Sequence, residues 1–264
     1  VMRDALHYEW VRLKTLRSTW WLTWLTLGLS GVLGLFALGL TDKPVTVTDY
    51  GDMLTGGQGT FDFLLQVLLG MIGVFAIGHE YRYGTMRPTL SAIPRRSRLM
   101  AAKVIVVSAF VLVIAILCHV LRYLVTLLIV GEPIRRLGLF PGPMGRVWFG
   151  VCAFMVLFAL AGLALASLFR NIPAALVILI VFPLIVENII RGLLGISAFS
   201  SIRGLAKVLP FSAGAQIYTY APVDSTTPVG FREVPSPYVG LTIFLVFLGI
   251  VLGLAWLLFE KRDA

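Results

Sequence analysis

One apolar run decides the fold, namely residues 104–130 with the sequence VIVVSAFVLVIAILCHVLRYLVTLLIV. A helix rises about 1.5 Å per residue and the hydrocarbon core of a bilayer is about 30 Å thick, so about 20 mostly apolar residues can cross it. The run does not alternate between apolar and polar residues as barrel strands do, so it predicts a transmembrane helix. The composition agrees with this, because 58% of the 264 residues are hydrophobic and only 13% are charged.

Six segments satisfy the same criterion of length and polarity: 20–40, 61–79, 104–130, 148–169, 172–190 and 238–259. We therefore predict an all-α integral membrane protein with six transmembrane helices in a single domain, residues 1–264. The net charge is +9, but the basic residues lie mainly between the apolar runs, which favours a topological role over nucleic-acid binding. Lys and Arg are densest in residues 82–103. This loop and both termini are thus predicted to be cytoplasmic, with the protein in the cell membrane.

Two segments outside the spans have helical character. In residues 1–19, apolar side chains recur at helical spacing with basic ones beside them, which predicts an amphipathic helix on the inner membrane surface. The residues assigned to this surface helix are Trp10, Arg12, Lys14 and Arg17. Residues 191–237 are apolar but interrupted by Gly and Pro, so we expect re-entrant helices at the outer side rather than a span. Within the spans, Gly150 and Gly162 predict close helix packing and Pro183 predicts a kink.

The most specific stretch follows the second span: residues 80–98 are EYRYGTMRPTLSAIPRRSR, and Lys103 comes as the third span begins. This pattern resembles the cytoplasmic loop of the type-2 ATP-binding-cassette (ABC-2) export permeases, which has an acidic residue, Gly-Thr, Leu, Pro, Arg and Lys in this order. Residues 9–21, EWVRLKTLRSTWW, also resemble the start of such permeases, especially actinobacterial ones. The resemblance covers the layout of the whole chain, whereas the matching motifs lie in its first part.

The resemblance implies that residues 80–103 hold a coupling helix, which transmits the closure of a separate ATPase to the spans. The residues assigned to coupling are Glu80, Gly84, Thr85, Leu90, Pro94, Arg95 and Arg98. A short helix bounded by Gly84 and Pro94 can project from the membrane into a cleft on a partner, and the flanking arginines can bind carboxylates or phosphates. The alternative is a basic loop that only sets the topology.

Ionizable and polar side chains also occur within or beside the spans, all at a similar height in the outer leaflet. They are Asp62, Gln66, His119, Arg122, Glu187 and Arg191. Charges in hydrocarbon usually face a bundle interior or an aqueous cavity, so these residues are candidates for a transport pathway or an outer gate. The alternative is a role in assembly alone, with Glu187 and Arg191 paired along one helix and Arg122 reaching outward to the interface.

Several motifs of enzymes are missing from the sequence. No phosphate-binding Gly-x-x-x-x-Gly-Lys-Ser/Thr loop occurs, so ATP and magnesium are expected in a partner ATPase and no cofactor in this chain. The three histidines lack the spacing of a metal site, and no catalytic signature of a hydrolase is found, so we predict a non-enzymatic subunit.

The resemblance implies a permease that works with two ATPase subunits and a second permease chain, a homodimer being favoured over a heterodimer. The expected activity is ATP-driven export of an amphipathic drug, antibiotic, peptide or lipid, as in multidrug efflux or antibiotic resistance. Two alternatives stay open. One is a non-transporting membrane anchor or immunity protein, and the other is a membrane-embedded lipid-modifying enzyme.

Overall fold

The computed structural model describes residues 2–35, 46–47, 49–51, 62–93, 95–142, 144–219 and 234–261. Five helices in these ranges are long and apolar enough to cross a membrane. They are α4 (Asp62–Arg82), α6 (Arg96–Val130), α8 (Met144–Phe169), the continuous helix Ile172–Leu194 and α13 (Pro237–Lys261). These five coincide with the second to sixth predicted spans, which confirms an all-α membrane protein.

The first predicted span, 20–40, is described only in part. Helix α2 (Arg17–Gly34) covers its beginning, and residues 36–40 lie outside the described residues. Helix α1 (Met2–Thr15) precedes α2 and is separated from it by Leu16, whose backbone is extended (φ −73°, ψ 119°). The count of six spans and the location of α1 on the membrane surface therefore stay predictions.

Helix α6 is longer than the sequence predicted. It begins at Arg96, inside the predicted loop 80–103, because residues 96–103 (RSRLMAAK) contain no helix breaker. Its 35 residues extend over about 52 Å, so the helix is longer than the hydrocarbon core is thick. Only a turn, the short helix α5 (Met86–Ala92) and a brief link remain between α4 and α6.

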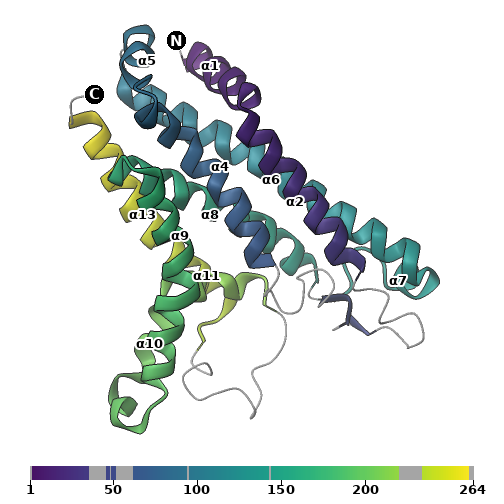
Figure 1. Ribbon diagram of the computed structural model, residues 1–264. Helices are drawn as coiled ribbons and strands as arrows, with labels where there is room; N and C mark the ends of the chain where they lie inside the picture. Colours follow the sequence, from purple (N-terminus) through teal and green to yellow (C-terminus); the bar gives the residue numbers. More distant parts are fainter. Residues whose placement is uncertain are drawn as a thin grey trace.

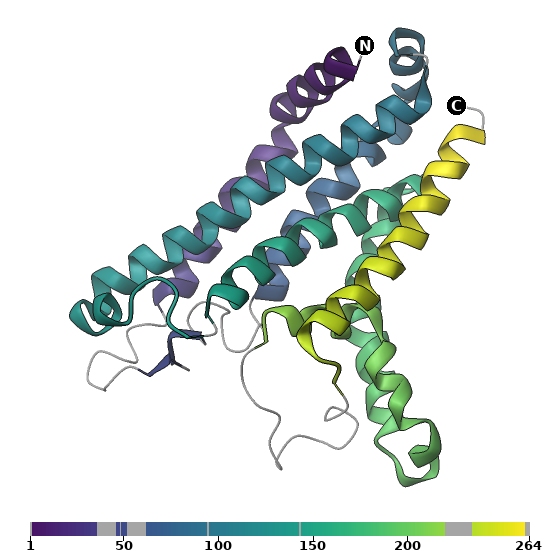
Figure 2. The ribbon, with the colours of Figure 1, turned by 180° about the vertical axis from the view of Figure 1, so that it is seen from behind.

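The two ends of the molecule differ in what they carry. Figures 1 and 2 show α1, α5 and both chain termini at one end, which we call the inner end. The opposite, outer end carries α7 (Glu132–Leu137) and the short helix α11 (Pro210–Gly214). This arrangement places the predicted coupling segment and both termini on the same side.

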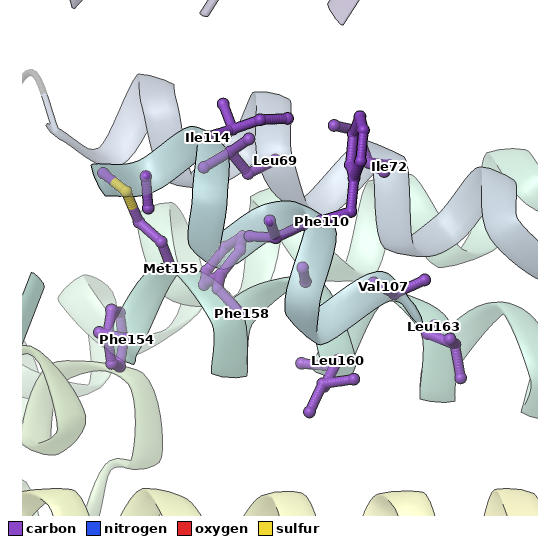
Figure 3. Close-up of a cluster of buried hydrophobic side chains, with 14 of the residues drawn as sticks. Leu69, Ile72, Val107, Phe110, Ile114, Phe154, Met155, Phe158, Leu160 and Leu163 are labelled. Atoms are coloured by element: carbon purple, nitrogen blue, oxygen red, sulfur yellow. The ribbon is translucent and has the colours of Figure 1, made fainter. Parts of the chain in front are cut away.

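The core lies where α4, α6 and α8 meet, and Figure 3 shows buried side chains that these three helices contribute. Glycines let α4 and α8 approach each other closely: a methyl group at Gly73 would overlap the carbonyl oxygen of Ala159. A Cβ at Gly162 would come within 2.5 Å of the carbonyl oxygen of Gly70. Gly150 likewise packs against Ile217, so the close packing predicted for Gly150 and Gly162 is confirmed.

The helix Ile172–Leu194 is irregular in its middle. It consists of α9 (Ile172–Val181), the π-helical turn η2 (Phe182–Val186) and α10 (Glu187–Leu194). Pro183 lies in the π turn, because its ring displaces the backbone carbonyl one turn earlier and it has no N–H to donate. The predicted interruption at Pro183 is therefore found as a π turn.

The described part of the predicted re-entrant segment consists of short helices. After α10 come the 3₁₀ helix η3 (Ser197–Val208), α11 and the 3₁₀ turn η4 (Ala215–Ile217). Gly214 of α11 lies against Phe154 of α8 and Phe244 of α13, so α11 returns to the bundle. The depth of this segment in a membrane stays a prediction, and residues 220–233 lie outside the described residues.

We expect Gly73→Ala to destabilise the protein by about 1–3 kcal/mol, because the added methyl group forces α4 and α8 apart. The matched control is Gly28→Ala in α2, where a Cβ meets nothing within 4 Å. Unfolding of both purified variants in detergent measures the difference. Equal stability of the two variants would contradict the packing described here.

Candidate functional site

A cluster of four charged side chains lies at the inner end, formed by Glu9, Arg12, Glu80 and Lys103; we call it the inner charge cluster. The Nζ atom of Lys103 donates to Glu9 Oε1 and to Glu80 Oε1, at 2.8 Å each. Arg12 pairs with Glu9 Oε2 at 2.9 Å and with Glu80 Oε1 at 2.9 Å. Arg12 and Lys103 also donate to the carbonyl oxygen of Ala76.

The inner charge cluster is buried and joins three helices. Lys103 is 0% exposed, and Glu9 and Glu80 are 2% and 1% exposed. Glu9 and Arg12 come from α1, Glu80 from the end of α4 and Lys103 from α6. Buried charges are tolerated when opposite charges and hydrogen bonds surround them, so α1, α4 and α6 hold one another through this cluster.

The turn after Glu80 is built on Gly84. Its φ of +66° is accessible to glycine without strain, and the N–H of Thr85 reaches back to the carbonyl of Glu80 at 3.0 Å. The turn ends α4 and starts α5. Glu80 therefore points into the protein, whereas Thr85 lies on the exposed turn.

Helix α5 has one packed side and one exposed side. Met86 and Thr89 are buried, and the Thr89 hydroxyl lies 3.0 Å from the hydroxyl of Tyr8 on α1. Leu90 and Arg98 are half-buried and Arg95 is exposed, while Pro94 lies outside the described residues. The exposed side of α5 carries Arg87, Pro88 and Ser91.

A second buried constellation lies near the outer end, formed by Asp62, His119 and Arg122; we call it the outer charge cluster. Arg122 Nη2 pairs with Asp62 Oδ1 at 2.8 Å, and His119 Nε2 lies 3.8 Å from Asp62 Oδ2. All three side chains are 0% exposed. Arg122 thus lies inside the bundle instead of reaching outward to the interface.

Two further polar groups lie within the outer half of the bundle. Gln66 Nε2 donates to the hydroxyl of Tyr218 at 2.9 Å. His119 Nδ1 lies 2.8 Å from the carbonyl of Ala115 and 4.0 Å from the Cys152 sulfur. Among the described residues no group of three His, Cys, Asp or Glu side chains is placed to hold a metal ion.

Glu187 has different partners from the outer charge cluster. Its carboxylate accepts the backbone N–H of Phe211 at 2.9 Å, the N–H of Ser212 at 2.7 Å and the Ser212 hydroxyl at 2.5 Å. It thereby holds the first turn of α11 to α10. Arg191 is half-buried one turn further on. The six predicted polar residues therefore divide into Asp62, Gln66, His119 and Arg122 on one hand and Glu187 with Arg191 on the other.

The inner and outer charge clusters link the same two antiparallel helices. On α4, Asp62 and Glu80 are 18 residues apart, and on α6, Lys103 and Arg122 are 19 residues apart. These separations correspond to about 27 Å and about 28 Å along a helix axis. Both values are close to the thickness of the hydrocarbon core, so α4 and α6 are joined at two points about one core thickness apart.

The sequence-based prediction missed several of these contacts. The sequence does not single out Glu9, and it indicates Lys103 only as part of the motif. A charged residue beside a span is expected to have a partner of opposite charge, which could have drawn attention to both residues. The sequence does not show which residue that partner is. Arg146, whose guanidinium donates to the carbonyls of Ile217 at 2.6 Å and Thr219 at 2.8 Å, gives no signal in the sequence.

Comparison with known proteins agrees with this architecture. The profile of a family described as ABC-2 family transporter protein matches residues 5–186. The match covers most of α1, both charge clusters and the segment of α5. The chain belongs to this family and is a multi-pass membrane protein. Members of this family are typically the non-enzymatic transmembrane subunit of a transporter and normally work with an ABC ATPase. A search of curated proteins finds no match.

We expect Lys103→Met to destabilise the protein by about 3–5 kcal/mol, because two buried carboxylates then share only Arg12. The matched control is Arg136→Gln, which removes a cation whose side chain is 83% exposed. Denaturant unfolding in detergent measures both. A loss no larger than that of the control would contradict the role of the inner charge cluster.

For the outer charge cluster we expect Asp62→Asn to cost more stability than the double variant Asp62→Asn/Arg122→Met. The single change leaves the guanidinium of Arg122 buried without its carboxylate, whereas the double change removes both charges. Thermal unfolding of the two variants and the wild type tests this order. If the double variant is the less stable one, the pair does not act as a unit.

Proposed function

We propose that this protein is the membrane subunit of an ATP-driven ABC exporter that moves an amphipathic substrate out across the cell membrane. A drug, an antibiotic, a peptide or a lipid fits the apolar spans as cargo. Both termini and α5 are cytoplasmic in this proposal. Two ATPase subunits bind below, and a second copy of this chain completes the pathway.

The observation that carries the proposal is the placement of α5. This helix lies at the inner end, together with both termini, and its solvent-exposed side carries Arg87, Pro88 and Ser91. Its other side is packed, with the Thr89 hydroxyl next to that of Tyr8 on α1. The end of α4, which precedes α5, is tied to α1 and α6 by the inner charge cluster. A short helix that is exposed on one side and packed on the other suits the transmission of a push from a partner.

The ion pairs define the path of that push. When ATP binding draws the two ATPases together, each α5 follows its ATPase and carries the inner ends of α4 and α6 with it. Because the same two helices are joined again by Asp62 and Arg122, the displacement reaches the outer end without being lost in a local bend. The π turn at residues 182–186 offers a place where the neighbouring helix can yield.

The outer charge cluster suits a gate. Its charges are buried and paired here, so this arrangement corresponds to a closed outer end. Movement of the joined outer ends of α4 and α6 away from the neighbouring helices would turn the paired Asp62 and Arg122 toward a polar vestibule through which the cargo leaves. Neither an anchor nor a lipid-modifying enzyme requires an anchored α5, and no observation favours these alternatives.

The first test is co-purification with the cognate ABC ATPase and measurement of its ATPase rate. We expect Arg87→Glu/Ser91→Trp, on the exposed side of α5, to reduce association and stimulated ATPase activity at least tenfold while the protein still inserts and purifies. The matched control is Arg135→Glu/Arg136→Trp at the outer end, where both side chains are exposed.

Equal effects of the two double variants would show that α5 is not the contact. If the wild-type chain itself never associates with an ATPase, the exporter proposal fails and the anchor hypothesis takes its place. Changes at Glu80 are less informative, because this carboxylate is buried in the inner charge cluster and its loss would disturb folding.

A further inference from the structure

A groove of about 850 Å³ runs along α1 and borders α6 at Val106. Arg3 and His7 line its polar part, with Asp4 next to Arg3 at the rim. Leu6, Trp10 and Val106 line its apolar part. The groove therefore combines hydrogen-bond donors with an apolar wall.

The side of α1 that faces this groove is basic and aromatic. Arg3, His7, Trp10 and Lys14 follow one another at intervals of four, three and four residues, which places them on one side of the helix. The three polar members are exposed, and the Trp10 side chain is 44% exposed. The Trp10 ring touches Phe110 of α6 edge-on, with ring centroids 6.1 Å apart.

The apolar wall continues along α6. Ile105, next to Val106, is 49% exposed, and Leu112 and Val113, further along α6 toward its C-terminal end, are 41% and 56% exposed. An indole ring at the boundary between basic residues and an apolar helix surface is typical of the membrane interface. A ligand in this groove can therefore place an anionic group on α1 and a hydrocarbon chain on α6.

We propose that this groove binds one anionic phospholipid of the leaflet at the inner end. The phosphate lies against Arg3 and His7, Lys14 adds positive charge further along α1, the glycerol region lies beside Trp10, and the acyl chains follow the exposed surface of α6. A free phosphate ion or an acidic peptide would use only the charges and leave the apolar wall uncovered. That this leaflet is the cytoplasmic one rests on the proposed function. That the ligand is an anionic phospholipid does not.

Lipid bound to this groove would also affect the contacts that the opposite side of α1 makes with α4 and α6. Glu9 and Arg12 of the inner charge cluster lie on that side, where they hold α4 and α6. A lipid that binds α1 and α6 together stabilises the same contact from the outside. Anionic lipid therefore raises the stability of the inner end of the bundle.

The test is native mass spectrometry of the full chain, purified in a neutral detergent and titrated with phosphatidylglycerol or with phosphatidylcholine of the same acyl chains. We expect the wild type to bind phosphatidylglycerol at least tenfold more tightly. Each cation near an anionic lipid contributes about a fivefold gain in affinity, so Arg3→Gln/Lys14→Gln loses at least tenfold. Arg3→Lys/Lys14→Arg keeps the affinity, and so does the outer-end control Arg135→Gln/Arg136→Gln.

Three results would overturn the proposal. These are equal binding of the two lipids by the wild type, an equal loss in the outer-end control, and displacement of the lipid by inorganic phosphate at the same concentration. The last result would identify a plain anion site. Because the titration uses the chain without an ATPase, its outcome is independent of whether the exporter proposal holds.

Discussion

The ammonium group of Lys103 lies where water does not reach it, and much of the inner end is organised around that charge. Two carboxylates balance it, one from α1 and one from the end of α4, and Arg12 balances those carboxylates in turn. None of the four groups can leave without exposing another to an apolar surrounding. Three segments that are far apart in the sequence are thus held in one arrangement by the cost of an unpaired charge.

The middle of the bundle is held by a different kind of contact. Between the two charge clusters, α4 lies against α8 through glycines and alanines, so the backbones approach until carbonyl oxygens meet glycine Cα atoms. In an apolar 18-residue stretch of each helix, 78% of the residues are buried in α8 but only 17% in α13. Helix α8 is therefore the centre of the fold, whereas α13 has a broad apolar face toward its surroundings.

The sequence predicted the class of fold because apolar length is a property of one segment at a time. Five spans could be located in this way, and single residues indicated the turn at Gly84 and the irregular turn at Pro183. The pairing of charges could not, because it depends on which helices are neighbours. Asp62, His119 and Arg122 were selected together from their common height, but Glu187 was placed with them although its partners are in α11. The height of a residue along a helix can be counted from the sequence, whereas the neighbouring helix that its side chain faces cannot.

The similar spacing of the two charge clusters on α4 and α6, 18 and 19 residues, has a consequence for how this protein can evolve. A single residue inserted between Asp62 and Glu80 would turn one end of α4 by about 100° relative to the other, so one cluster would lose its partner unless α6 changed in step. The distance between the two ionic residues on α4 must therefore match the corresponding distance on α6. Homologues in thicker or thinner membranes can adjust their length only by coordinated changes in both helices, or by tilting the pair as a unit.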